Sequence, residues 1–139
     1  MKKFLSFVMF VFLLSCNSQK EVYVGNPQII SFGSMGGFTN ESTEFKLHSN
    51  GELWMFNSFK NDSSMVVQLR KKQTRKLFEQ VYQIGLDTID LKNPGNMSSF
   101  IQIMSKTSEN KVVWPKGDQQ VQTEISDFYK ELFSYTKTK

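Results

Sequence analysis

Hydrophobic and polar side chains alternate along residues 43–57, and this pattern predicts a β-hairpin. The alternation runs on both sides of the Asn50-Gly51 dipeptide, which is the strongest short signal for a two-residue type I′ turn. Such a turn pairs Leu47 with Trp54 and Phe45 with Phe56, so these four side chains are expected on the core face of a sheet. The opposite face then receives Glu44, Lys46, His48 and Asn57.

Four other segments carry the alternation or the short apolar run of a strand. They are residues 28–33, 63–70, 99–105 and 111–114. In the second of them, Met65, Val67 and Leu69 are expected to point inward. Just before the third, Asn93-Pro94-Gly95-Asn96 places proline and glycine at the central positions of a type II turn.

Two segments repeat their apolar residues at the spacing of a helix. The first runs from about Lys72 or Thr74 to Ile84 and is followed by Gly85, a residue type that ends many helices in the left-handed conformation. The second covers about residues 121–135. The order strands, helix, strands, helix predicts an α+β fold, with an antiparallel sheet of about five to six strands and both helices packed on one face.

The N-terminus has the layout of an export signal. Lys2 and Lys3 precede an apolar run from Phe4 to Leu14, an arrangement typical of a signal peptide. The run is shorter than the roughly 20 apolar residues that a membrane-spanning helix needs. Residues 1–15 are therefore predicted to be a signal peptide.

The apolar run ends in Leu13-Leu14-Ser15-Cys16, which resembles the lipobox of bacterial lipoproteins. The resemblance implies that Cys16 becomes the first residue of the mature protein and carries a diacylglycerol on its sulfur and a further acyl chain, such as palmitate, on its amine. Several acyl chains together anchor a protein stably to a membrane. Residues 16–27 would then be the lipidated cysteine and a polar tether, and residues 28–139 a single domain.

Composition narrows the chemistry of this domain. No cysteine follows position 16, and His48 is the only histidine, so a disulfide and a two-histidine zinc motif are excluded and His48 has no positioned partner for nucleophilic catalysis. Asp87 with Asp90, or Glu41 with Glu44, are better explained as solvated loop residues than as an acid and base pair. We expect no enzyme activity, no bound metal and no cofactor.

The charge of the chain is modest once the signal is removed. Loss of Lys2 and Lys3 leaves 15 Lys and Arg against 13 Asp and Glu, and export also argues against a nucleic-acid partner. The one run of cations, Arg70 to Lys76, crowds the start of the first predicted helix, where positive charge opposes the helix dipole. It is either a solvated face or a contact for anionic headgroups or an acidic partner.

A glycine-containing loop joins two of the predicted strands. Its sequence FGSMGGFTNESTEF fits no phosphate-binding pattern and leads into a strand rather than a helix N-terminus. Either Gly36 and Gly37 supply positive φ or close packing at a turn, or the side chains beside them form an apolar tip that contacts a partner. The candidate partner-binding loop consists of Met35, Gly36, Gly37, Phe38 and Thr39.

Two further resemblances bear on this loop. Gly-Gly-Phe-Thr at 36–39 and Asn-Pro-Gly-Asn at 93–96 resemble a group of small uncharacterised lipoproteins of Bacteroidota-type bacteria, over nearly the whole mature chain. In addition, a Gly36-Gly37-Phe38 loop entering a strand, followed by helix, hairpin and helix, is similar to emfourin, a small protein inhibitor of thermolysin-like zinc metalloproteases. That similarity implies that residues 35–40 would be presented to a protease cleft.

These observations predict a lipid-anchored, non-catalytic binding or accessory module of the cell envelope, whose partner is an envelope protein or a glycan. A metalloprotease inhibitor and a purely structural envelope lipoprotein remain as alternatives. Asn17 is not the aspartate associated with inner-membrane retention, and residues 18–21 lack the paired acids of surface-export signals. An outer-membrane anchor facing the periplasm is therefore expected.

Overall fold

One antiparallel sheet packs against two helices, which confirms the predicted α+β class. The computed structural model describes residues 27–37 and 42–137. Its strands are β1 (Ile29–Gly36), β2 (Thr43–His48), β3 (Glu52–Asn57), β4 (Asp62–Gln68), β5 (Met97–Met104) and β6 (Glu109–Pro115). The helices are α2 (Lys71–Ile84) and α3 (Thr123–Ser134), so the order along the chain is strands, helix, strands, helix.

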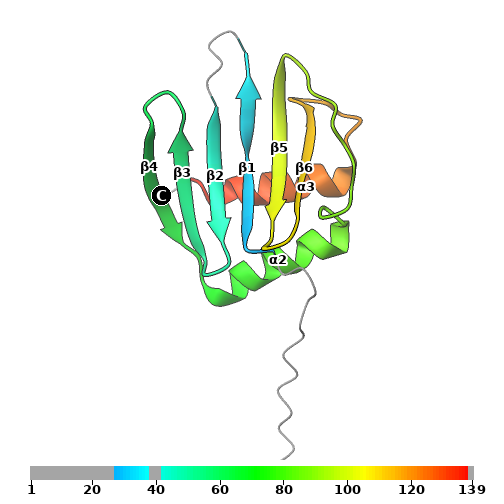
Figure 1. The fold of residues 1–139 in the computed structure, drawn as a ribbon. Helices are drawn as coiled ribbons and strands as arrows, with labels where there is room; N and C mark the ends of the chain where they lie inside the picture. The colour runs from blue at the N-terminus through cyan, green and yellow to red at the C-terminus, as the bar shows by residue number, and fades with distance from the viewer. Residues whose placement is uncertain (1–26, 38–41, 138–139) are drawn as a thin grey trace, which may run out of the picture.

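The six strands form a single sheet in the order β4-β3-β2-β1-β5-β6. The first four strands make a meander that runs outward from β1, and every neighbouring pair is antiparallel. After β4 the chain crosses the sheet through α2 and returns as β5 on the other side of β1 (Figure 1). β1 is thus a central strand, which pairs with β2 from Ile29 to Ser34 and with β5 from Ile29 to Gly36.

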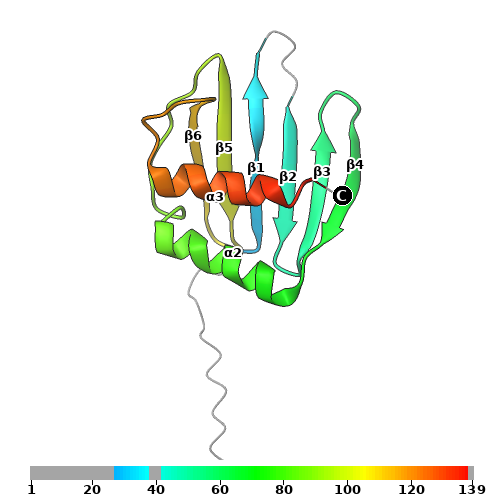
Figure 2. The same ribbon diagram turned by 180° about the vertical axis from the view of Figure 1, so that it is seen from behind.

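Both helices cover the same face of the sheet and run across the strands (Figure 2). α2 buries Thr74, Leu77 and Val81, as its apolar stripe predicts. It ends at Gly85, whose φ of +80° is left-handed, and the nitrogen of Leu86 donates to the carbonyl oxygen of Val81 at 3.0 Å. The predicted glycine stop is therefore confirmed.

The core lies between the sheet and the helices and includes an aromatic cluster. Phe32 stacks on Phe45 with ring centroids 5.5 Å apart, and Phe133 of α3 meets both rings edge-on at 5.3 and 5.6 Å. Trp114 is buried and packs edge-on against Tyr129 at 5.1 Å. Burial of each such side chain contributes about 1.5–3 kcal/mol to folding. The buried residues of α3 are Ile125, Phe128 and Leu132.

The predicted register of the β2–β3 hairpin is wrong by one residue. Leu47 pairs with Leu53 and Phe45 with Met55, so Lys46 faces Trp54 on the open side of the sheet. The loop has three residues, because the nitrogen of Gly51 donates to the carbonyl oxygen of His48 at 2.9 Å and Gly51 has a φ of +91°. The core face therefore receives Leu53 and Met55, whereas Trp54 and Phe56 lie on the face without helices.

A bulge explains a second error on the neighbouring strand. The register between β3 and β4 shifts between Leu53 and Trp54, so that Leu53 pairs with Val67 and Trp54 with Met65. An extra residue in one strand sends the following side chains to the other face. Leu69 is buried and Val67 half-buried as predicted, but Met65 is 53% exposed.

The Asn93-Pro94-Gly95-Asn96 segment is not a type II turn. Gly95 does not have the positive φ that this turn requires at its third residue. Glycine provides space there instead, since a Cβ would lie only 3.0 Å from the Cβ of Pro115. The hydroxyl of Ser98 closes the segment by accepting from the Gly95 nitrogen at 3.0 Å.

Candidate functional site

The glycine loop lies at the end of the sheet farthest from the start of the domain. β1 begins just after Pro27, near the β2–β3 turn. It ends at Gly36, which pairs with Met97 of β5. The β3–β4 turn lies at the same end, because Asn57 pairs with both Thr43 and Asp62. We call this the distal end of the domain (the upper end in Figure 1).

Gly36 and Gly37 have the positive φ and the close packing that are expected if they serve the turn itself. Gly36 and Gly37 both have a φ of +92°, a conformation that glycine adopts without steric cost. A Cβ on Gly36 would lie 2.5 Å from the carbonyl oxygen of Asn96. The same oxygen accepts a hydrogen bond from the Gly37 nitrogen at 2.9 Å. Both the conformation and the close approach therefore require glycine at position 36.

The other end of the loop is attached to the β3–β4 turn. The Ser42 nitrogen donates to Ser58 Oγ at 3.0 Å, and that hydroxyl donates back to the Ser42 carbonyl oxygen at 3.1 Å. The Ser58 nitrogen reaches the same carbonyl at 3.3 Å. The segment between Gly37 and Ser42 thus begins and ends at points that neighbouring loops hold in place. Met35 is half-buried, and Phe38 and Thr39 lie outside the described residues.

Apolar side chains are exposed beside this loop. Phe59 in the β3–β4 turn is 77% exposed, and Met97 at the start of β5 is 42% exposed. Sequence reasoning missed both residues, although a phenylalanine between Ser58 and Lys60 in a polar turn is an available signal. A mostly polar hollow of about 320 Å³ at the β3–β4 turn is lined by Ser42, Glu44, Phe56, Asn57, Ser58, Asn61, Asp62 and Ser63.

The catalytic candidates that the structure describes are not gathered at one place, and Glu41 lies outside the described residues. His48 pairs with Ile29 on the open face of the sheet, at the end opposite the loop. Glu44 forms an ion pair with Lys46 at 3.7 Å, and Asp90 pairs with Lys92 at 3.6 Å. Within residues 27–37 and 42–137, no group of three His, Cys, Asp or Glu side chains could hold a metal ion.

Several predictions about the N-terminal region lie outside the described residues. These are the signal peptide, the lipidation of Cys16 and the tether up to residue 26. Among the residues that are described, no helix is long and apolar enough to cross a membrane.

Comparison of the chain with known families and curated proteins found no match.

Proposed function

We propose that this chain is a lipid-anchored lipoprotein of the cell envelope. Its non-catalytic domain binds a partner at the distal end. The lipobox at Cys16 supports the anchor. The domain begins at Pro27, so about ten residues separate it from Cys16 and could reach on the order of 30 Å. An anchor on that side leaves the distal end directed away from the membrane.

The main support for a binding role is that both ends of the glycine loop are hydrogen-bonded to neighbouring loops. A loop whose ends are fixed loses less conformational entropy when it binds than a free one. Here the ends are fixed by Asn96 on one side and Ser58 on the other, and Phe59 and Met97 add exposed apolar surface beside it. An envelope protein is the partner class that such an apolar rim fits best.

Expression of the full chain in a bacterium tests the anchor. Intact-mass measurement of the membrane-extracted protein should give a chain that begins at Cys16 and carries acyl groups. The Cys16→Ser variant should lose both the lipid and the cleavage. An unmodified Cys16 in the wild-type protein would contradict the proposal.

Capture from envelope extract tests the distal end. The lipidated chain should retain a partner that the Phe38→Ala, Phe59→Ala double variant loses. Met65→Ala is the matched control, because Met65 is also exposed but lies on the open face of β4. If all three proteins capture the same set, or none, the distal end is not the binding surface.

A metalloprotease is a specific second candidate for that partner, and the doubly attached loop favours it. Protease inhibitors gain affinity when their binding loops are restrained before they bind, and Asn96 and Ser58 restrain the residues at either end of this loop, Gly37 and Ser42. The full chain should then inhibit a thermolysin-like zinc protease, and Phe38→Ala should weaken inhibition at least about tenfold, the loss expected for a hot-spot aromatic residue. Full protease activity at micromolar concentrations of the chain would remove this candidate.

A further inference from the structure

The start of α2 carries a concentrated positive charge that the distal binding site does not use. Five of seven consecutive residues are basic: Arg70, Lys71, Lys72, Arg75 and Lys76. Without these five, the 15 basic residues that follow the signal fall to 10, against 13 acidic residues. The rest of the mature chain is therefore net acidic, and the domain has one strongly basic region.

Most of this charge is not neutralised by the protein. Lys76 pairs with Glu131 at 2.7 Å, but in the part of the chain that the structure describes the other four make no ion pair. All four are exposed. We call Arg70, Lys71, Lys72 and Arg75 the basic patch.

The position of the patch opposes the stability of its own helix. Cations in the first turn of a helix meet the positive end of the helix dipole, and the first turn of α2 contains no acidic residue. The charged side chains do not cap the helix either: Arg70, at the N-cap position, makes no side-chain cap hydrogen bond, and its backbone nitrogen donates to Gln73 Oε1 at 3.1 Å. The charges are thus not explained by the folding of α2.

The patch lies where the tether enters the domain. Pro27, the first described residue, lines one hollow of about 550 Å³ together with Lys71, Arg75 and Phe78. The polar turn residues Ser49 and Asn50 line the same hollow. Figure 1 shows α2 lying across the end of the sheet opposite the distal end.

We propose that the basic patch binds anionic phospholipid headgroups and so holds the domain upright on the membrane that carries its anchor. This inference rests on the proposed lipidation of Cys16. The tether reaches only on the order of 30 Å, so the patch is confined near the surface. Each basic residue next to an anionic membrane strengthens its attraction about fivefold. Pro27 also lines a second hollow, which contains Asp87 rather than the basic residues, so the start of α2 is expected to approach the membrane more closely than its end.

Energy transfer from a dye on the domain to a labelled headgroup lipid tests the proposal. Ser49→Cys places the dye beside the patch, and Ser63→Cys places it near the distal end; both serines are exposed. The only natural cysteine, Cys16, is blocked by acylation. The lipidated chain is reconstituted in vesicles of phosphatidylcholine, with or without phosphatidylglycerol.

Phosphatidylglycerol should increase transfer from position 49 and leave transfer from position 63 low. The increase should vanish in molar salt, which shortens the Debye length to about 3 Å, and in a variant with all four patch residues replaced by Gln. The matched control removes the same charge elsewhere, by Lys60→Gln, Lys92→Gln, Lys116→Gln and Lys137→Gln, and should keep the increase. Thermal melting of both quadruple variants verifies that they fold.

Equal transfer in the two kinds of vesicle, or equal effects of the two quadruple variants, would overturn the proposal and point to an acidic protein as the occupant. Intact mass separates this failure from failure of the anchor. If the preparation carries no lipid, the same chain is added to preformed vesicles. The same two comparisons, of lipid composition and of variants, then decide whether the patch binds.

Discussion

The phenol of Tyr129 on α3 donates a hydrogen bond to the carbonyl oxygen of Gly33 at 2.8 Å. This contact joins the last helix to the central strand three residues before the distal glycine pair. Burial raises the pKa of the Tyr129 phenol above its ordinary value of 10.0, and Ser99 opposes this with a smaller effect. The phenol therefore stays protonated, and the bond intact, up to pH 10.

Tyr129→Phe should lower the free energy of unfolding by about 1 kcal/mol, the typical contribution of such a bond. Urea unfolding at neutral pH measures this. Because the folded pKa is raised, the stabilisation is fully present below pH 10 and disappears as the pH rises through the folded value. A wild-type protein no more stable than the variant at neutral pH would show that this bond contributes nothing.

Gly36→Ala should damage the distal end more than Gly117→Ala. Both glycines have positive φ, +92° and +83°, so each alanine has a conformational cost of about 1–2 kcal/mol. A Cβ at position 117 meets nothing within 4 Å, but at position 36 it meets the Asn96 carbonyl oxygen at 2.5 Å. Urea unfolding of the two variants separates clash from backbone strain, and equal losses would contradict the described contact.

Leu53→Ala should destabilise the protein by about 2–5 kcal/mol, as expected for a leucine in a core. Leu53 is 1% exposed, and Trp54 beside it is only half-buried on the open face. Trp54→Ala should therefore cost less. If Trp54→Ala lowers the free energy of unfolding more than Leu53→Ala does, the result would support the register predicted from the sequence, in which Trp54 faces the core.

The same hairpin shows why sequence reasoning recovers some features and misses others. Helix and strand patterns are local, so the order of elements, the buried stripe of α2 and the stop at Gly85 could all be predicted. The register of β2 against β3 depends on Gly51, where a Cβ would lie 2.7 Å from the carbonyl oxygen of Leu69. Leu69 follows the end of β4, 18 residues after Gly51, so the Asn-Gly dipeptide alone does not reveal this contact.

In the candidate site, too, some features could be predicted from the local sequence and others could not. The positive φ of Gly36 and Gly37 follows from residue type, and the structure has it. The attachment of Ser42 to Ser58 joins residues 16 positions apart, and the exposure of Phe59 depends on which face of a turn it occupies. These features arise from tertiary contacts: the polar sequence around Phe59 could indicate an exposed side chain, but not that it lies beside the glycine loop.

Lys72→Glu should stabilise α2 while weakening attraction to anionic membranes. An acidic residue in the first helical turn gains about 0.3–1 kcal/mol from the helix dipole, and Lys72 is exposed, with no ion pair among the described residues. Thermal or urea unfolding should show the gain. Gln83→Glu, on the same helix but in its last turn, is the control and should not stabilise.

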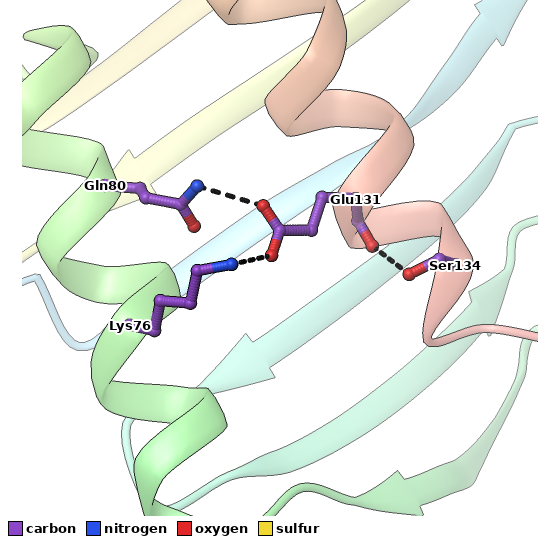
Figure 3. A network of polar contacts seen from close by, with 4 residues as sticks. All are labelled: Lys76, Gln80, Glu131 and Ser134. Carbon is purple, nitrogen blue, oxygen red and sulfur yellow. Dashed lines mark hydrogen bonds and ion pairs between the residues drawn. The ribbon is translucent and has the colours of Figure 1, made fainter.

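Glu131 makes the packing of α3 against α2 sensitive to acid. Its carboxylate accepts hydrogen bonds from Lys76 Nζ at 2.7 Å and Gln80 Nε2 at 2.9 Å (Figure 3). Burial raises the pKa of Glu131, but the two donated bonds and the charge of Lys76 outweigh it, so the pKa lies below its ordinary value of 4.5. Hydrogen bonding to Glu131 and its charge raise the pKa of Lys76 above 10.5.

The stabilisation from this network is therefore present between pH 4.5 and 10.5. It is lost as the pH falls through the folded pKa of Glu131, and as it rises through that of Lys76. Glu131→Gln should flatten the acid side of the stability profile, measured by urea unfolding from pH 7 down to about pH 3. Asp127→Asn is the matched control, because Asp127 lies on the same helix in an exposed pair with Lys130 and should leave the acid dependence unchanged. If the two variants have the same profile, the interhelical network does not contribute to the acid sensitivity of the fold.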